Sequence, residues 1–456
     1  WGATPDLDWH KLIFGTKTGV ADGILRSEVN RLARLMPAID GAADALIPII
    51  AAFTVYRSYL PLGLGHLEAA RIHARDELPE LAQRIDEVAG VLATEGDPAS
   101  IRFQQTSGMV MAKGVEDTAF YRFGSLTSLN EVGADPSEFA IGVHTFHDRQ
   151  TRRQSALPNS MTTLSTHDTK RSEDVRATIS ALSERPELWS SFAARVHAVA
   201  DLGDPVIENL LWQAIVGAWP ASRERLHGYA EKAARESGIS TNWIDPNAVF
   251  ESRLHAAVDS AFDNEEVSAA IGDVVEAIGP ASSSNSLSAK LLQLASPGIP
   301  DVYQGSELWD RSLVDPDNRR SVDFGERRRL LDRIDSGWLP PIDASGAAKL
   351  LLVSRTLRLR RDHPERFTRY RGLTVFGAKA DHAIAFDRGG VIAVATRLSH
   401  GLEQSGGWQD TTIEPGGREL VDVLTGRVFG AGSVRLADLL ERYPVALLTK
   451  NRGVRE

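Results

Sequence analysis

A histidine and an aspartate stand side by side in this sequence, at His167 and Asp168, directly after a run that predicts a β-strand over residues 161–166. Polar residues just past the carboxyl end of a parallel strand form the catalytic face of barrel enzymes. There a carboxylate can accept hydrogen bonds from substrate hydroxyls and stabilise a developing positive charge. The alternative is structural: Asp168 can cap the helix predicted from residue 173, and the dipeptide alone favours this cap.

A second polar cluster lies in the stretch MAKGVEDTAFYR, which ends at Arg122. Lys113, Glu116 and Tyr121 combine charged hydrogen-bonding groups with an aromatic face. This combination suits sugar rings, which present apolar C–H faces and hydroxyl edges. The alternative is a helix in which Phe120 is a core residue and Lys113 forms an i,i+4 ion pair with Asp117. Taken alone, the stretch favours the helix.

A third polar stretch, SPGIPDVYQGSELWDRSLVDPDNRR, begins at Ser296 and contains a strand predicted over residues 299–303. Beyond the strand it carries Glu307, Trp309, Asp310, Asp315, Asp317 and Arg319. Carboxylate oxygens bind hard cations, but the spacing has none of the regularity of a calcium-binding loop. The sequence also lacks a phosphate-binding glycine-rich loop and a zinc-binding HExxH pattern. We therefore expect solvated loop residues here, and neither a metal nor a cofactor.

Helices and a few widely spaced strands must position these groups. Leu25, Val29, Leu32 and Met36 recur at helical spacing and predict a helix over residues 24–36. The same reasoning predicts helices over 66–92 and 173–262, a loop over 280–290 that feeds a helix near Ser286, and strands over 161–166 and 299–303. The apolar run 49–56 is compatible with a buried strand, although periodicity does not separate a short strand from a helix. This alternation predicts an α/β fold with parallel strands up to about residue 370.

The pattern changes after about residue 371. Short alternating runs, AIAFD, VIAVATR, ELVDVLTG and VALLTK, are separated by Gly, Asp and Pro. Such runs are typical of antiparallel strands. We therefore expect two domains, residues 1–370 and a C-terminal antiparallel β-sandwich over residues 371–456.

Composition narrows the classes of partner. The 456 residues carry a net charge of −10, which argues against nucleic acid or an anionic membrane as the main partner. The sequence contains no cysteine, so it offers no disulfides and no thiolate chemistry. The apolar run 45–53 is too short to span a bilayer, and the opening WGATPDLDWH has no signal-peptide pattern. These features favour a cytoplasmic protein.

Four long stretches together resemble the family of maltooligosyltrehalose synthases, a branch of the α-amylase superfamily. They are FQQTSGMVMAKGVEDTAFYR, SLNEVGADP, STHDTKRSEDVRA and SPGIPDVYQGSELWDRSLVDPDNRRSVDF, and they occur in the family's order. The resemblance extends from early in the chain to the C-terminal β domain. It outweighs the structural alternatives that each stretch favours alone.

The resemblance implies a fold and a reaction. The fold is a (β/α)₈ TIM barrel of the α-amylase type with helical insertions, at about 60–100 and 173–285, followed by the β-sandwich. The reaction is an intramolecular transglucosylation: the reducing-end α-1,4 linkage of a maltooligosaccharide becomes α,α-1,1, which gives maltooligosyltrehalose. Two alternatives stay open, a retaining glucan hydrolase or transglycosylase of the same superfamily, and a non-catalytic glucan-binding chain.

The resemblance also implies roles for individual residues. Asp168 is the third carboxylate of the superfamily, which favours the oxocarbenium-like transition state, and His167 binds the same sugar. Further residues are expected to bind substrate or to orient the loop that carries this pair: Lys113, Glu116, Tyr121, Lys170 and Arg171.

The sequence departs from the family at two catalytic groups. The nucleophilic Asp and the general-acid Glu belong to strands four and five of such barrels, and neither motif occurs here. We expect an N-terminal half of the same enzyme to supply them, so that this chain holds only the later strands. Three strands with open edges are not expected to fold stably alone. The expected partners are the maltooligosaccharide substrate, that N-terminal half and a trehalose-releasing hydrolase, and the mechanism needs no cofactor.

Overall fold

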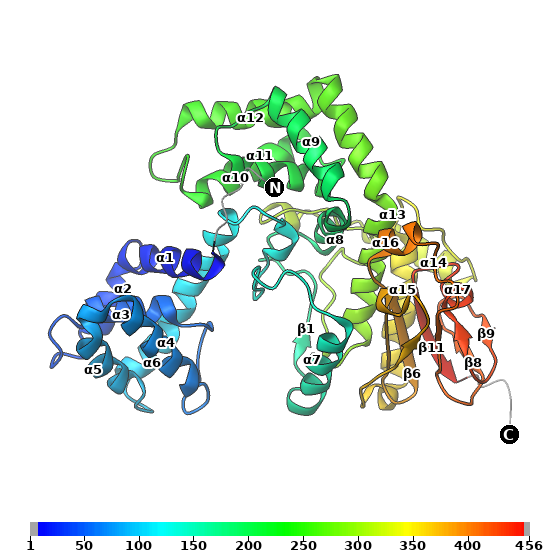
Figure 1. Ribbon diagram of the computed structural model, residues 1–456, viewed down its shortest axis with the longest axis horizontal. Coiled ribbons are helices and arrows are strands. Elements are labelled where there is room, and N and C mark those ends of the chain that lie inside the picture. The colour runs from blue at the N-terminus through cyan, green and yellow to red at the C-terminus, as the bar shows by residue number, and fades with distance from the viewer. Residues whose placement is uncertain (1–7, 451–456) are drawn as a thin grey trace. The chain divides into compact units, whose positions relative to one another are not determined.

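The computed structural model describes residues 8–450, which form two compact units (Figure 1). The first unit comprises residues 8–125, 202–210 and 230–255, and the second comprises residues 126–201, 211–229 and 256–450. Three helices have residues in both: α10 (Pro205–Ala218), α11 (Arg223–Ser237) and α12 (Ala248–Asp263).

The first unit is built from helices. They are α1 (Trp9–Asp22), α2 (Arg26–Ala33), α3 (Ala42–Ala52), α4 (Leu64–Glu77), η1 (Pro79–Leu81), α5 (Ala82–Leu92), α6 (Pro98–Met111), the π-helical turn η2 (Ala112–Glu116) and η3 (Ala119–Tyr121). Local sequence explains where some of them begin. The Asp8 carboxylate accepts hydrogen bonds from the first amides of α1, and Asp97 caps α6 just ahead of Pro98.

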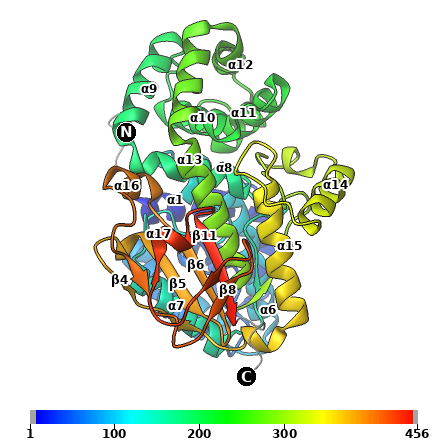
Figure 2. The same cartoon turned by 90° about the vertical axis from the view of Figure 1, so that its right-hand side faces the viewer.

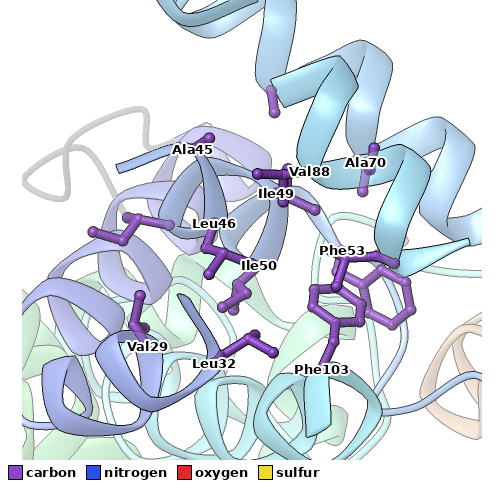
Figure 3. Close-up of a cluster of buried hydrophobic side chains, with 14 of the residues drawn as sticks. Val29, Leu32, Ala45, Leu46, Ile49, Ile50, Phe53, Ala70, Val88 and Phe103 are labelled. Carbon is purple, nitrogen blue, oxygen red and sulfur yellow. The ribbon is translucent and has the colours of Figure 1, made fainter. Parts of the chain in front are cut away.

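Helix α3 forms the centre of the first hydrophobic core (Figure 3). Ile49 and Ile50 are fully buried, and the Phe53 and Phe103 rings meet edge to face with centroids 5.2 Å apart. The strand considered for residues 49–56 is therefore wrong, because the first half of this run belongs to helix α3 and the second half forms no strand. Burial on nearly all sides removes the polar positions that would have revealed a helical period.

Two short parallel strands carry the chain toward the candidate site. In the second unit, β1 (Met161–Thr162) pairs with β2 (Ile299–Pro300) in parallel register, with Met161 opposite Ile299. The strands are shorter than the predicted 161–166 and 299–303. Gly298 has φ +118°, and a Cβ there would lie 2.7 Å from the Ser160 carbonyl oxygen, so the close pairing requires glycine.

Helices make up most of the connection between these strands. It contains α8 (Glu173–Ala181), η5 (Leu182–Glu184), α9 (Pro186–Val199), the three helices shared by both units, and α13 (Glu265–Ala295). The loop predicted over residues 280–290 is wrong, because α13 continues through Pro280 for 31 residues. Its serines at 284, 286 and 288 are buried, so tertiary packing overrides their weak helix propensity.

Antiparallel strands dominate the chain beyond residue 371, as predicted. A six-stranded sheet has the order β3-β5-β6-β11-β8-β9, and a three-stranded sheet has the order β10-β7-β4 (Figure 2). The strands are β3 (Arg371–Gly372), β4 (Val375–Phe376), β5 (Ala383–Asp387), β6 (Val391–Thr396), β7 (Thr412–Ile413), β8 (Leu420–Asp422), β9 (Val428–Phe429), β10 (Val434–Arg435) and β11 (Val445–Lys450). The short helices α16 (Ser399–Gln404) and α17 (Leu436–Leu439) lie between strands.

Both faces of the larger sheet are buried. Phe386 and Leu447 belong to one hydrophobic cluster, together with residues of α13 and α15 (Ala347–Asp362). Ala385, next to Phe386, and Leu448, next to Leu447, belong to the cluster on the other face. Successive side chains of a strand point to opposite faces, and both faces are buried here. The strands therefore read as nearly continuous apolar runs.

The class of fold is therefore helix-rich with antiparallel sheets at the C-terminal end. Further helices in the second unit are η4 (Thr127–Leu129), α7 (Val143–Ala156), η6 (Asp317–Arg319), α14 (Phe324–Asp335), η7 (Pro364–Phe367) and η8 (Ala380–His382). Between residues 8 and 450, no helix has both the length and the apolar character to cross a lipid bilayer. Parallel pairing in this range is confined to β1 and β2.

The buried centre of α3 gives a first prediction. We expect Ile49→Ala to lower the free energy of unfolding by about 2–5 kcal/mol, because it leaves a cavity in a fully buried site. The matched control is Ile24→Ala, since Ile24 is exposed. Urea unfolding followed by circular dichroism measures both variants. Equal stabilities of the two would contradict the central position of α3.

Candidate active site

The segments that leave β1 and β2 are tied together by a side chain of α13. The Gln293 amide nitrogen donates to the backbone oxygens of Thr162, at 3.2 Å, and Asp301, at 2.6 Å. The Asp301 amide also donates to the Thr162 oxygen at 2.8 Å. The two strands therefore end side by side, and the polar loops that follow them start from one edge.

His167 and Asp168 lie in a turn a few residues beyond β1. Their side chains are exposed, at 61% and 65%, and the imidazole Nε2 lies 3.4 Å from a carboxylate oxygen. The Asp168 amide donates to the Thr166 hydroxyl at 3.1 Å. Asn318, in the loop after β2, donates to the backbone oxygens of Thr166 and His167 at 3.3 and 3.0 Å. The backbone of the turn is thus fixed while both side chains face outward.

The structural alternative for Asp168 is wrong. Helix α8 begins at Glu173, and the residue in the N-cap position is Ser172. Asp168 precedes that cap by four residues and belongs to the turn instead. An exposed carboxylate that caps no helix is available to a ligand.

Glu131 anchors the same loop from a distant part of the sequence. Its buried carboxylate accepts hydrogen bonds from the backbone amides of Lys170, at 3.0 Å, and Arg171, at 3.3 Å. The Arg176 guanidinium lies 3.7 Å away. We did not identify Glu131 as a site residue from the sequence, although it belongs to the SLNEVGADP stretch.

Lys170 and Arg171 have buried side chains, with exposures of 5% and 1%. The Arg171 guanidinium donates to the Tyr229 hydroxyl at 2.8 Å, and the Arg171 backbone bridges to Leu313. Such contacts allow Arg171 to brace the loop that carries His167 and Asp168.

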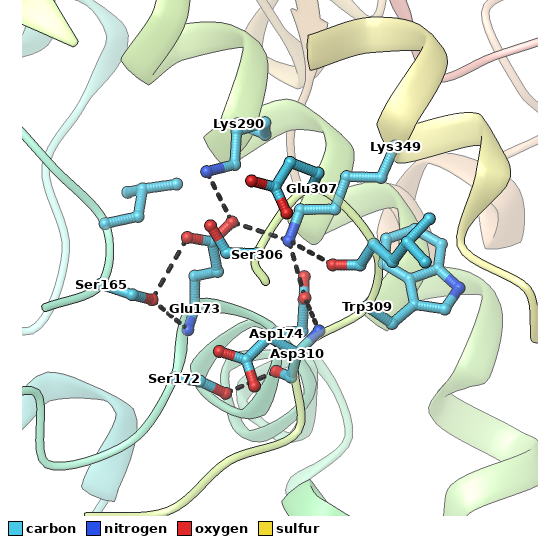
Figure 4. Close-up of polar contacts among 12 residues, drawn as sticks. Ser165, Ser172, Glu173, Asp174, Lys290, Ser306, Glu307, Trp309, Asp310 and Lys349 are labelled. Atoms are coloured by element: carbon cyan, nitrogen blue, oxygen red, sulfur yellow. Dashed lines mark hydrogen bonds and ion pairs between the residues drawn. The ribbon is translucent and has the colours of Figure 1, made fainter. Parts of the chain in front are cut away.

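Four buried charged side chains surround the start of α8 (Figure 4). The Glu173 carboxylate lies 2.7 Å from the ammonium groups of both Lys290 and Lys349. Lys349 also lies 2.7 Å from the Asp174 carboxylate, which accepts a hydrogen bond from the Asp310 amide at 2.6 Å. These ion pairs join α8, α13, α15 and the loop after β2. We refer to Glu173, Asp174, Lys290 and Lys349 as the charge cluster.

The charge cluster keeps the Glu173 carboxylate ionised. Burial raises the pKa of the Glu173 carboxyl, but Lys349 and Lys290 outweigh burial and lower that pKa to about 2. Since the folded-state pKa lies below the unfolded value, Glu173 stabilises the fold above the unfolded pKa. This contribution is lost as the pH falls toward about 2. Burial and the neighbouring Asp174 raise the pKa of Asp310, which the Ser312 hydroxyl opposes.

Lys113, Glu116 and Tyr121 belong to the first unit, whereas His167, Asp168, Lys170 and Arg171 belong to the second. Lys113 and Glu116 lie in the π-helical turn η2, a kind of turn that is frequent at functional sites. Lys113 is about half exposed, and its ammonium group lies 2.7 Å from the Asp117 carboxylate. Both features of the structural alternative are present, since this i,i+4 pair forms and the buried Phe120 ring stacks on Trp9.

Glu116, the last residue of this turn, and Tyr121 of η3 are both buried. The Tyr56 hydroxyl donates to the Glu116 carboxylate. At Gly114, a Cβ would lie 2.8 Å from the Lys17 side chain, so only glycine allows η2 to approach α1 this closely. The turn that carries Lys113 is therefore held in place by its contacts with Tyr56 and α1.

Three of the acidic residues after β2 pair with arginines. Glu307 pairs with Arg327 at 3.0 Å, and Asp317 pairs with Arg225 at 2.7 Å. Asp315 pairs with Arg319. These carboxylates are paired with guanidinium groups, so their ion pairs stabilise the loop after β2.

Comparison with known proteins gives the family context. No family model matches the chain. A curated Mycobacterium tuberculosis protein named as a maltooligosyl trehalose synthase is 42% identical over 452 residues, which cover 96% of this chain and 57% of that protein. The solved structure of maltooligosyltrehalose synthase from Arthrobacter ramosus is 56% identical with a TM-score of 0.95, and the match covers 98% of this chain and 59% of that one. A structure titled DSM5389 glycosyltrehalose synthase is 29% identical with a TM-score of 0.80, and covers 98% of this chain and 56% of that one.

The resemblance that the four sequence stretches indicated is therefore confirmed. The match covers almost all of this chain, and the matched proteins carry the names of glycosyltrehalose-forming enzymes. More particularly, it matches maltooligosyltrehalose synthases, and it spans a little under three fifths of their length.

The charge cluster gives the second prediction. We expect Lys349→Met to lower the free energy of unfolding by about 3–5 kcal/mol, because it leaves two buried carboxylates without their shared counter-ion. The control is Lys11→Met, at an exposed position of α1. Thermal and urea unfolding at neutral pH measure both. A Lys349→Met variant as stable as the control would show that the cluster does not hold the start of α8.

Proposed function

We propose that this chain forms part of a maltooligosyltrehalose synthase, an isomerase that converts the reducing-end α-1,4 linkage of a maltooligosaccharide into an α,α-1,1 linkage. The observation that carries the proposal is the match to the Arthrobacter ramosus enzyme, at 56% identity and a TM-score of 0.95 over 98% of the chain. The glucose released from the reducing end turns over in the site and attacks the covalent glycosyl-enzyme through its own anomeric hydroxyl, which frees the nucleophilic carboxylate. The product carries a trehalose end, which places the reaction in trehalose biosynthesis.

Asp168 is proposed as the carboxylate that stabilises the positively charged transition state, and His167 as a hydrogen-bonding partner of the same sugar. Their exposed side chains on a backbone fixed by Asn318 and Glu131 support these roles. A charge that is already held where positive charge develops costs no reorganisation during the reaction. Lys170 and Arg171 orient the loop through their buried contacts.

The covalent steps need two further groups. In a retaining mechanism, one carboxylate attacks the anomeric carbon and a carboxylic acid protonates the leaving oxygen. We propose that an N-terminal half of the same enzyme supplies both, since the relatives are longer than this chain. In that assembly β1 and β2 are later strands of an α-amylase-type barrel, residues 1–370 are its C-terminal part, and residues 371–456 are the β-sandwich. The cysteine-free sequence supports a cytoplasmic location, and a trehalose-releasing hydrolase is the proposed partner.

Lys113 is proposed to hydrogen-bond the glucosyl unit while it turns. Its side chain is half exposed and belongs to a π-helical turn, which supports direct contact with a ligand. Glu116 and Tyr121 are buried, so their contribution to substrate binding is to fix this turn.

The third prediction tests Asp168 in the enzyme completed by its N-terminal half. Asp168→Asn is expected to lower the turnover of maltopentaose by about 100-fold or more, because it removes a charge that stabilises the transition state. The matched control is Asp148→Asn, since Asp148 also pairs with an exposed histidine, His144, at 2.9 Å. Near-normal turnover of Asp168→Asn would contradict the assigned role.

The reducing-end count in the same assay separates the candidate reactions. The proposed isomerisation lowers the count, hydrolysis raises it, and transfer between chains leaves it unchanged. If maltopentaose is recovered without any product, the result would favour a non-catalytic glucan-binding chain.

The fourth prediction concerns Lys113. Lys113→Ala is expected to increase the share of hydrolysis relative to isomerisation, because the released glucosyl unit loses a contact that retains it. Product ratios from maltopentaose measure the effect, with Lys11→Ala as the control at an exposed position. An unchanged product ratio would remove Lys113 from the site.

A further inference from the structure

We propose that the second unit carries an additional binding site for a linear α-1,4-glucan, in a cleft of about 820 Å³ between α13 and the C-terminal β region. The choice of ligand rests on the proposed function. Ser283 and Ser284 of α13 line one part of the cleft, and Ser399, Trp408 and Tyr443 line other parts. None of the lining residues belongs to the loop 165–171 or to the side chains that hold it.

Two hydroxyl groups in the cleft have unmet hydrogen-bonding capacity. Ser284 is only 6% exposed, and its Oγ has no hydrogen-bond partner. The buried Oγ of Ser399, the first residue of α16, has none either. Buried hydroxyls in folded proteins nearly always have a partner. Both residues line the same cleft, so a polar ligand there would satisfy these hydroxyls once each side chain turns toward it.

Aromatic side chains complement these hydroxyls. The Trp408 indole is partly buried against the cluster that contains Ile413 and Leu439. Tyr443 is only 4% exposed and its hydroxyl donates to the Pro340 oxygen at 2.7 Å, so it supports the wall of the cleft while Trp408 offers the ring face. A sugar ring presents an apolar face, which packs on an aromatic ring, and hydroxyl edges, which hydrogen-bond to serines. Binding pockets commonly combine apolar walls with a few placed polar groups.

The backbone is strained at the positions that set this arrangement. Over residues 8–450, the non-glycine residues with positive φ are Leu398, at 51°, and Gln409, at 50°. Leu398 immediately precedes Ser399, and Gln409 immediately follows Trp408. Strained residues gather at ligand-binding sites, where they fix side chains that the fold alone would not place. The strain therefore supports the cleft as a built site.

The charges of the cleft favour a neutral ligand. The Glu441 carboxylate is paired with Arg427 at 2.7 Å, and the Arg442 guanidinium donates to the Leu339 oxygen at 2.9 Å. Glu403 adds a negative charge that disfavours anions. A neutral polyhydroxylated chain fits these groups, and an α-1,4-glucan is the one that the proposed reaction supplies.

Isothermal titration calorimetry with maltoheptaose, in the enzyme completed by its N-terminal half, tests the site, as the fifth prediction. Trp408→Ala is expected to weaken binding at least tenfold. The matched control is Trp338→Ala, which removes a half-buried indole that stacks under Arg333 at 3.8 Å outside the cleft. Ser284→Ala is expected to keep normal unfolding, since its hydroxyl has no partner to lose, and to weaken binding. Equal binding by the unaltered, Trp408→Ala and Ser284→Ala chains would overturn the proposal.

Asp168→Asn separates this inference from the proposed function. Maltoheptaose binding that survives Asp168→Asn but is weakened by Trp408→Ala assigns the ligand to the cleft. Binding weakened only by Asp168→Asn would overturn the cleft and leave the proposed function intact. Equal affinity for the β-1,4-linked cellopentaose, or no binding by the unaltered chain, would overturn the glucan assignment, while the reducing-end assay still reports on the reaction.

Discussion

The ion pairs of the charge cluster are the interaction on which the candidate site depends. Glu173 and Asp174 open α8 in a buried environment, where unpaired carboxylates would be very costly. Lys290 and Lys349 neutralise them from α13 and α15, and the Asp310 amide adds a contact from the loop after β2. Helices far apart in sequence thereby meet where the loop of His167 and Asp168 enters α8.

The site combines a buried frame with an exposed pair. Glu131, Asn318 and the charge cluster hold backbone or buried groups, while the imidazole and carboxylate of the pair face outward. A charge that stabilises a transition state is most effective when the protein positions it before the substrate arrives, and this frame fixes the backbone that carries the Asp168 carboxylate without contacting that carboxylate. The frame therefore supplies stability, and the chemistry proposed above is assigned to the exposed pair.

Sequence reasoning worked where the signal is local. Lys113 and Asp117 are four residues apart, and the antiparallel strands alternate between two apolar faces, so both followed from spacing. It failed at α3, where burial on all sides hides the period, and at Pro280, where packing carries α13 through a Ser-rich segment. The charge cluster was also missed, since Asp174 and Lys349 are 175 residues apart and each looks like an ordinary helix residue. Long-range pairing of this kind leaves no local pattern.

The central claim is that a fixed loop presents Asp168 to the sugar whose linkage is rearranged. The most direct measurement is a crystal structure of the chain together with its N-terminal half and a bound maltooligosaccharide. The Asp168 carboxylate should lie within hydrogen-bonding distance of ring hydroxyls at the reducing end of the sugar. A sugar bound elsewhere, with Asp168 facing only solvent, would contradict the claim.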